Sequence, residues 1–145
     1  MNKFEALGLK AEIVQSVTDM GFENLTPIQE QAIPVLISGT MDFVGLAQTG
    51  TGKTAAFGLP LLQLINPSDK FPQALIVCPT RELCLQITSD LQDFKKHIKG
   101  VNIEAVYGGA SITMQIRNLR HGVQIVVATP GRLIDLIERK AIDLQ

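Results

Sequence analysis

Apolar residues along this chain fall into two kinds of pattern, and each predicts a different element. Residues 10–20 carry apolar side chains three and four positions apart, which predicts a helix buried along one face. Residues 74–78 form a continuous apolar run, typical of a parallel strand covered on both faces, and residues 124–128 form a second such run. The apolar run at 43–46 is interpreted as a buried strand ahead of a Gly-rich turn.

Strands and helices alternate along the chain. The predicted order is helix 10–20, helix from 26, strand 43–47, helix ending near 65, strand 74–78, helix 80–98, strand 102–107, helix 111–120, strand 124–128 and helix 129–139. The fold class is therefore α/β, an open parallel sheet with helices on both faces. Ligands of such sheets bind at the carboxyl ends of the strands, where the polar motifs of this chain lie.

The Gly-rich turn has the residues of a phosphate-binding loop. Residues 47–54 read Ala-Gln-Thr-Gly-Thr-Gly-Lys-Thr between a predicted strand and a predicted helix. Gly50 and Gly52 let backbone N–H groups point inward, and the helix that follows adds the positive end of its dipole. Lys53 is expected to reach the β- and γ-phosphates of a nucleotide, and the Thr54 hydroxyl to ligate Mg²⁺.

Composition narrows the function classes. The chain has 145 residues, 46% hydrophobic and 19% charged, as in one ordinary soluble domain. A net charge of −1 argues against bulk electrostatic capture of nucleic acid, so such contacts must be local. Cys78 and Cys84 are the only cysteines and are expected to be buried thiols. Without a secretory leader or an apolar run near the ~20 residues of a membrane span, a cytoplasmic protein that stays out of membranes is expected.

Several short strings follow one another in a fixed order. They are Phe4, Gly21-Phe22, Thr26-Pro27-Ile28-Gln29, the phosphate loop, Pro79-Thr80-Arg81-Glu82-Leu83, Gly108-Gly109 and Thr129-Pro130-Gly131-Arg132. Together they closely resemble the first recombinase-A-like domain of the DEAD-box ATP-dependent RNA helicases, over essentially the whole chain. In that family the phosphate loop usually starts with Ala, as here at Ala47, where the general pattern has Gly. The resemblance implies one partial helicase ATP-binding domain over 1–145, with an adenine-reading segment at 4–29, a phosphate loop at 47–54 and RNA-contacting motifs at 79–83, 108–109 and 129–132.

The resemblance implies a site for ATP and Mg²⁺. Its residues would be Phe4, Phe22, Gln29, Gln48, Thr49, Gly50, Thr51, Gly52, Lys53 and Thr54, with Lys53 and Thr54 catalytic and Thr54 the Mg²⁺ ligand. Gln29 would hydrogen-bond the adenine edge, Phe4 would stack on the base, and Phe22 would shape the pocket. Two alternatives stay open, because Thr26 and Gln29 also form the pattern of a capping box and Phe4 is equally a core residue.

The remaining strings resemble the family's RNA-contacting motifs. The residues implied are Thr80, Arg81, Gly108, Gly109, Thr129, Gly131 and Arg132. Arg81 would bind a phosphate, the glycine pair would let the RNA backbone approach, and the helix start at 129–131 would contact a second phosphate. Such contacts read the backbone, so RNA binding should be independent of sequence. The structural alternatives are a surface helix start, a turn glycine pair and a helix cap with Arg132 in an ion pair.

The family's Asp-Glu-Ala-Asp motif and its motif that couples hydrolysis to unwinding are absent from the sequence. No Asp-Glu-Ala-Asp string follows an apolar run, and the family's second domain has no counterpart in these residues. The expectation is therefore a C-terminally truncated, amino-terminal part of an RNA helicase that binds ATP without hydrolysing it, since phosphoryl transfer also needs a positioned water and further charge stabilisation. A parallel sheet without its later strands has an unpaired edge, which predicts self-association or reduced stability.

Two other functions are compatible with the residues. One is a different phosphate-loop NTPase or DNA helicase, which would have no need of Gln29 and no preference for adenine. The other is a non-catalytic helicase scaffold that binds RNA or a partner protein without nucleotide.

Overall fold

The computed structural model describes residues 2–48 and 52–144. The chain divides into two compact units, one formed by Met1–Leu64 with Asp93–Lys99 and the other by Ile65–Gln92 with Gly100–Gln145. The phosphate loop belongs to the first unit, and the three expected RNA motifs belong to the second.

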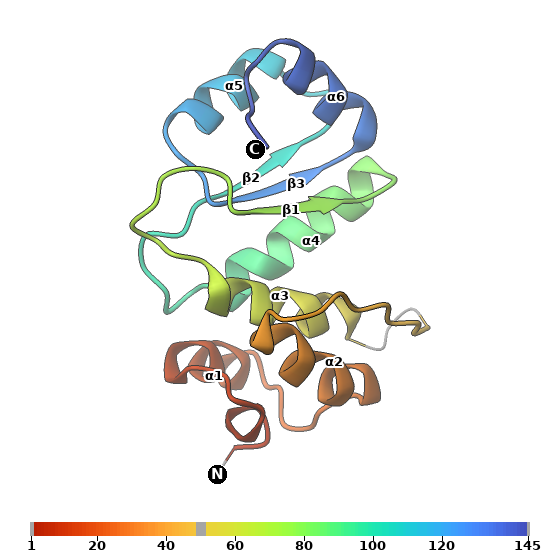
Figure 1. Cartoon of the computed structure of the whole chain (residues 1–145), viewed down its shortest axis with the longest axis vertical. Helices are drawn as coiled ribbons and strands as arrows, with labels where there is room; N and C mark the ends of the chain where they lie inside the picture. The colour runs from red at the N-terminus through yellow and green to blue at the C-terminus, as the bar shows by residue number, and fades with distance from the viewer. Residues whose placement is uncertain (1, 49–51, 145) are drawn as a thin grey trace. The chain divides into compact units, whose positions relative to one another are not determined.

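The first unit is helical in its described residues. It contains a 3-10 turn, Glu5–Leu7, and three helices: α1 (Ala11–Asp19), α2 (Pro27–Ser38) and α3 (Lys53–Leu64). As expected, α1 ends just before Gly21, whose φ of +84° is a left-handed conformation that suits glycine. The helices α2 and α3 pack side by side (Figure 1).

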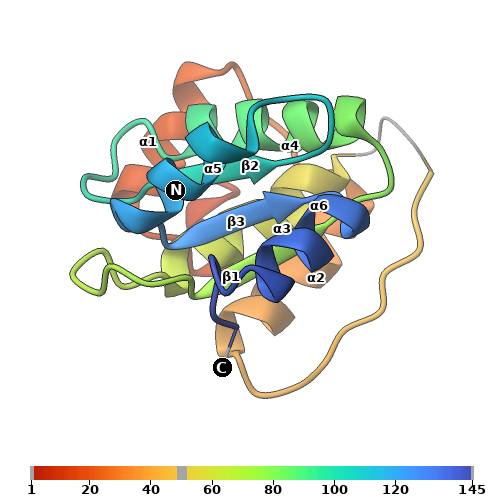
Figure 2. The same cartoon turned by 90° about the horizontal axis from the view of Figure 1, so that it is seen from above.

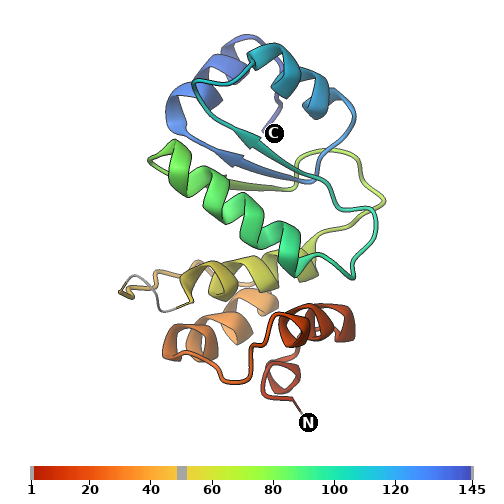
Figure 3. The same ribbon diagram turned by 180° about the vertical axis from the view of Figure 1, so that it is seen from behind.

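The second unit is a parallel sheet between helices. Its elements in chain order are β1 (Ala74–Val77), α4 (Arg81–Phe94), β2 (Ile103–Val106), α5 (Ile112–Arg120), β3 (Ile125–Ala128) and α6 (Pro130–Glu138). The strands pair in parallel in the order β1-β3-β2, with β3 in the centre (Figure 2). The helices α5 and α6 lie on one face of the sheet and α4 on the other (Figures 1 and 3). The predicted α/β class with helices on both faces is confirmed.

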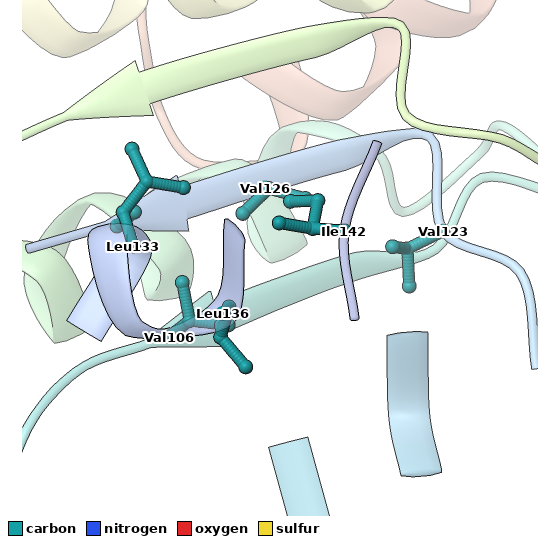
Figure 4. Packing of buried hydrophobic residues seen from close by; sticks show 7 residues of the cluster. Val106, Val123, Val126, Leu133, Leu136 and Ile142 are labelled. Carbon is teal, nitrogen blue, oxygen red and sulfur yellow. The ribbon is translucent and has the colours of Figure 1, made fainter. Parts of the chain in front are cut away.

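One hydrophobic core cluster of this unit lies between the sheet and the helices α5 and α6. Side chains from β2, β3, α6 and the segment after α6 converge there (Figure 4). The buried members are Val106, Val123, Val126, Ala128, Leu133, Leu136 and Ile142, with Ile112, Ile116, Leu119 and Ala141 packed against them. All four residues of β3 are buried, as the continuous apolar run at 124–128 predicts for a central strand.

The predicted strand at 43–47 is wrong. Residues 42–48 have no regular secondary structure, and no strand is drawn over them in Figure 2. Val44 is 87% exposed and Leu46 is 92% exposed, so this apolar run is not buried either. A strand needs a hydrogen-bonded neighbour, and no described residue pairs with this segment.

The expectation that 74–78 is covered on both faces is also wrong in part. The side chains of β1 alternate between half-buried and exposed, with Leu75 38% and Val77 55% exposed. Because β1 pairs only with β3, it is an edge strand among the described residues. A run of apolar residues therefore identified the strand and not its place in the sheet. Within the described part of the chain, no helix is long and apolar enough to cross a membrane.

Candidate functional site

The phosphate loop ends where α3 begins, so its last residues lie at a helix N-terminus. Gly52 has a φ of +79°, a left-handed conformation that favours glycine. The ammonium nitrogen of Lys53 donates a 2.8 Å hydrogen bond to the carbonyl oxygen of Ala47, which ties the end of the loop to its start. The predicted nucleotide-binding residues Thr49, Gly50 and Thr51 lie outside the described residues.

Gln29 connects α2 to the phosphate loop. Its amide oxygen accepts from the backbone N–H of Thr26 at 3.1 Å, and its own backbone N–H donates to the Thr26 hydroxyl at 3.4 Å, which is the capping box that the sequence left open. Its amide nitrogen donates to the carbonyl oxygen of Gly52 at 3.3 Å. The side chain is 2% exposed, and a Cβ on Gly52 would overlap its amide nitrogen. Gln29, which takes part in the capping box of α2, therefore also contacts the end of the phosphate loop at Gly52.

The predicted base-stacking residue lies in the core. Phe4 is 0% exposed, and its ring lies 6.1 Å from that of Phe22, tilted by 43°. Phe22 in turn meets the edge of Phe94 at 6.2 Å. A base would reach the ring of Phe4 only if this cluster opened, so stacking stays a prediction and the core alternative describes the structure.

A pocket of about 240 Å³ lies beside Lys53. It is formed by α2, α3 and residues 43–45, and its lining consists of Ile28, Ala32, Leu36, Phe43, Gly45, Lys53, Ala56 and Phe57. Apart from Lys53 the lining side chains are apolar, so the Lys53 ammonium is its one side-chain hydrogen-bond donor. Gln29 is not among the lining residues.

The residues at the loop fit a nucleotide phosphate. A cation, Lys53, stands at the start of α3, where backbone N–H groups lack intrahelical partners and the helix dipole is positive. Thr54 follows in the first helical turn and is half-buried, and Gln48 is exposed at the start of the loop. In residues 2–48 and 52–144, no three His, Cys, Asp or Glu side chains gather as a metal site. The Thr54 hydroxyl is an oxygen ligand of the kind that Mg²⁺ takes together with phosphate oxygens.

In the second unit, two of the predicted motifs touch. The Thr80 hydroxyl accepts the backbone N–H of Leu83, in the first turn of α4, at 3.1 Å, so Thr80 caps that helix. The guanidinium of Arg81 lies 5.2 Å from the centre of the Tyr107 ring. Gly109 has a φ of +86°, and a Cβ there would lie 3.1 Å from a guanidinium nitrogen of Arg81. A Cβ on Gly108 would meet nothing within 4 Å, so this glycine borders open space.

The start of α6 carries the third motif. Thr129 is the N-cap residue but makes no side-chain capping bond, and its N–H donates to the carbonyl of Val106 at 3.0 Å. A Cβ on Gly131 would meet nothing within 4 Å. Since β1, β2 and β3 are parallel, the motifs that follow them lie at one edge of the sheet, where the sequence predicted them.

Arg132 turns inward instead of forming the ion pair considered from the sequence. One guanidinium nitrogen, Nη1, donates to the carbonyl of Ala110 at 3.2 Å and to the amide oxygen of Gln115 at 2.8 Å. Sequence reasoning missed Gln115, which is 4% exposed. The available signal was a glutamine at helical spacing from Ile112 and Leu119, two residues that face the core.

A parallel α/β sheet, a phosphate loop at a helix start and polar motifs at one sheet edge define a nucleotide-binding domain of the phosphate-loop class. Residues 26–145 match the model of the DEAD/DEAH box helicase family. The chain therefore belongs to the DEAD/DEAH box helicase family, and the resemblance drawn from the sequence is confirmed.

Curated relatives extend beyond this chain. It is 52% identical over 141 residues to the ATP-dependent RNA helicase DeaD of Escherichia coli (strain K12), covering 97% of this chain and 22% of that protein. It is 51% identical over 143 residues to the DEAD-box ATP-dependent RNA helicase CshA of Streptococcus pneumoniae serotype 4, covering 99% of this chain and 27% of that protein. The chain thus spans about a quarter of the length of these relatives.

Solved structures share the fold. A DEAD box protein from Methanococcus jannaschii superposes with a TM-score of 0.88 at 38% identity, over 94% of this chain and 37% of that chain. The Saccharomyces cerevisiae protein Dbp5, solved as a variant bound to RNA and ADP BeF3, superposes with a TM-score of 0.87 at 33% identity, over 100% of this chain and 36% of that chain.

Proposed function

We propose that this chain supplies ATP·Mg²⁺ binding and sequence-independent RNA-backbone binding to an ATP-dependent RNA helicase, within one partial helicase domain over 1–145. The observation that carries the proposal is the set of contacts at the ends of the 47–54 segment: the Gln29 amide bonds to the carbonyl of Gly52, and the cation Lys53 bonds to the carbonyl of Ala47. Membership of the family and the name of the DeaD relative support the same activity.

In the nucleotide site, Lys53 would leave the carbonyl of Ala47 and bind the β- and γ-phosphates. Thr54 would ligate Mg²⁺, which neutralises phosphate charge when it is bound. Gln29 would use the remaining hydrogen of its amide nitrogen and the second lone pair of its oxygen for adenine. Phe22 and Phe4 would support the base after the aromatic cluster opens, and Gln48, Thr49, Gly50 and Thr51 would complete the loop.

In the RNA site, Arg81 would bind a phosphate with a guanidinium that Tyr107 supports from one side. Gly108 and Gly131 border open space, where a phosphodiester can approach the backbone. Thr80, Gly109, Thr129 and Arg132 would complete this surface. Backbone contacts of this kind do not read bases, so oligoribonucleotides of different sequence should bind alike.

The nucleotide site is tested by binding of a fluorescent ATP analogue with Mg²⁺, competed by ATP, ADP and GTP. Gln29→Glu is the informative variant, because a carboxylate oxygen can still accept from the N–H of Thr26 and keep the capping box while the amide donor is lost. We expect the wild type to prefer adenine nucleotides and Gln29→Glu to lose that preference. Thr26→Ala is the matched control, since it breaks the capping box and leaves the Gln29 amide in place.

Equal competition by ATP and GTP in the wild type would favour a general phosphate loop over the adenine site. RNA binding that persists with no nucleotide binding would favour the scaffold alternative.

Hydrolysis is a separate part of the proposal. The chain has no Asp-Glu-Ala-Asp string to hold Mg²⁺ and a water on the far side of the γ-phosphate. We expect phosphate release from ATP by the wild-type chain, with or without RNA, to equal that of Lys53→Ala. A rate that is clearly higher in the wild type would contradict this expectation.

A further inference from the structure

Gln115 lies where a helix of this unit would ordinarily bury an apolar side chain. It is on α5, three residues after Ile112 and four before Leu119, both of which pack against the core. It is 4% exposed. Burying an amide is unfavourable unless its hydrogen bonds are replaced, so its partners explain why the position accommodates a glutamine.

One of those partners, Arg132, belongs to a proposed RNA motif, and the other, Tyr107, directly precedes a second one. The amide oxygen of Gln115 accepts from Arg132, in the first turn of α6, at 2.8 Å. Its amide nitrogen donates to the carbonyl oxygen of Tyr107, immediately before the glycine pair, at 3.2 Å. One planar side chain therefore holds the turn after β2 and the start of α6 at a defined separation.

The network continues to Arg81, in the proposed RNA motif at 79–83. The ring of Tyr107 lies against the guanidinium of Arg81, 5.2 Å from ring centre to guanidinium carbon. The same Arg132 nitrogen that meets Gln115 also donates to the carbonyl of Ala110, on the other side of the glycine pair. Arg81, the glycine turn and Arg132 are thus linked through Tyr107 and Gln115, and both polar atoms of the Gln115 amide are used.

We propose that Gln115 is a positioning residue for RNA binding, whose amide holds the 107–110 turn and Arg132 together so that separate phosphate contacts are presented at once. The inference rests on the proposed RNA-binding function. Gln115 itself is buried and touches no ligand, so it acts through the groups that it orients.

The test uses the full chain and a short oligouridylate, with the dissociation constant measured over a series of salt concentrations. Gln115→Met keeps the length and burial of the side chain and removes both hydrogen bonds. We expect RNA binding by this variant to be about tenfold weaker, which corresponds to the loss of one hydrogen bond to a charged group. We also expect its dissociation constant to depend less steeply on salt, because fewer phosphates are neutralised together. Gln86→Met, on the exposed surface of α4, is the matched control and should change neither quantity.

The salt slope separates positioning from a structural role. Gln115→Met removes no charge, so a loss of stability alone would leave the slope of the folded protein unchanged. Gln115→Glu keeps an acceptor for Arg132 but loses the donor to the carbonyl of Tyr107, so its slope should be shallower than that of the wild type. It also serves if the Met variant does not fold. In a double variant with Arg132→Met, the effects should not multiply, because both substitutions interrupt one network.

The outcomes are distinct. A wild type that binds RNA and a Gln115→Met variant with the same affinity and slope would overturn the inference and leave the RNA-binding function standing. A Glu variant with the affinity and slope of the wild type would also overturn it, because the hydrogen bond to Tyr107 would then not be needed to hold the turn. A wild type that does not bind RNA would overturn the proposed function and the inference with it.

Discussion

At the scale of single residues, the sequence predicts that both cysteines are buried thiols, and their burial lowers the reactivity of the thiol groups. Cys78 is 2% and Cys84 is 0% exposed. Burial, and then the neighbouring Cys78, raises the pKa of Cys84 to about 12. The thiolate is the reactive form, so Cys84 is an inert side chain in the folded protein.

We therefore expect iodoacetamide to modify Cys84 in the native chain at a rate roughly a hundredfold or more below that in denaturant, since reaction must wait for opening. Peptide mass spectrometry at intervals measures both rates. Comparable rates in the two states would show that the thiol is accessible.

Glu104, on β2, is half-buried, and its burial raises the pKa of the carboxyl, with a smaller opposing effect from the hydrogen bond with Asn118. A raised pKa in the folded state gives a contribution to stability that is complete below the unfolded pKa and is lost as the pH rises through the folded pKa. Glu104→Gln keeps a neutral side chain at every pH. The variant should unfold at a higher temperature than the wild type at pH 7, and this difference should vanish as the pH falls below the pKa of the unfolded carboxyl. A difference that is constant with pH would contradict this assignment.

At the scale of elements, local signals were the most reliable. The helix predicted from residue 26 begins at Pro27 with Thr26 and Gln29 in a capping box, and the helix predicted over 10–20 ends just before Gly21. Each depends on residues within one helical turn, so no distant contact can alter the outcome. The helix predicted to reach residue 98 ends instead at Phe94, an ordinary error at a helix end.

Thr26→Ala should lower the free energy of unfolding by about 1 kcal/mol, because it removes the side-chain acceptor at the start of α2. Urea denaturation followed by circular dichroism measures the change. Thr18→Ala, in the last turn of α1, replaces a hydroxyl that bonds back to the carbonyl of Val14 and should have little effect. Equal losses in the two variants would show that the cap is not the source.

At the scale of the whole molecule, exposed apolar residues remain on an edge strand. Leu75 and Val77 of β1 are exposed, and the strand pairs only with β3 among the described residues. Unpaired apolar edges favour association between chains, and a charge on the edge opposes it. We therefore expect sedimentation velocity to show association that grows with concentration, and Val77→Lys to reduce it.

Leu64→Lys is the control for this experiment. It adds the same charge at an exposed leucine of α3, away from any strand. If the wild type sediments as a monomer at every concentration, self-association through this edge does not occur. If both lysine variants reduce association equally, net charge and not the edge is responsible.

The sequence by itself determined the parallel α/β class and the polar motifs after the strands, and it placed the start of α2 and the end of α1, which depend on neighbouring residues. Its error at 43–47 has a physical cause, because Val44 and Leu46 have strand-like side chains but a strand also needs a hydrogen-bonded partner, which lies elsewhere in a chain. Only the tertiary structure placed Phe4 in the core, set β1 at an edge and brought Gln115 between Tyr107 and Arg132. These features depend on contacts between residues distant in sequence, and the pattern of residues along the chain does not show which distant groups will be in contact.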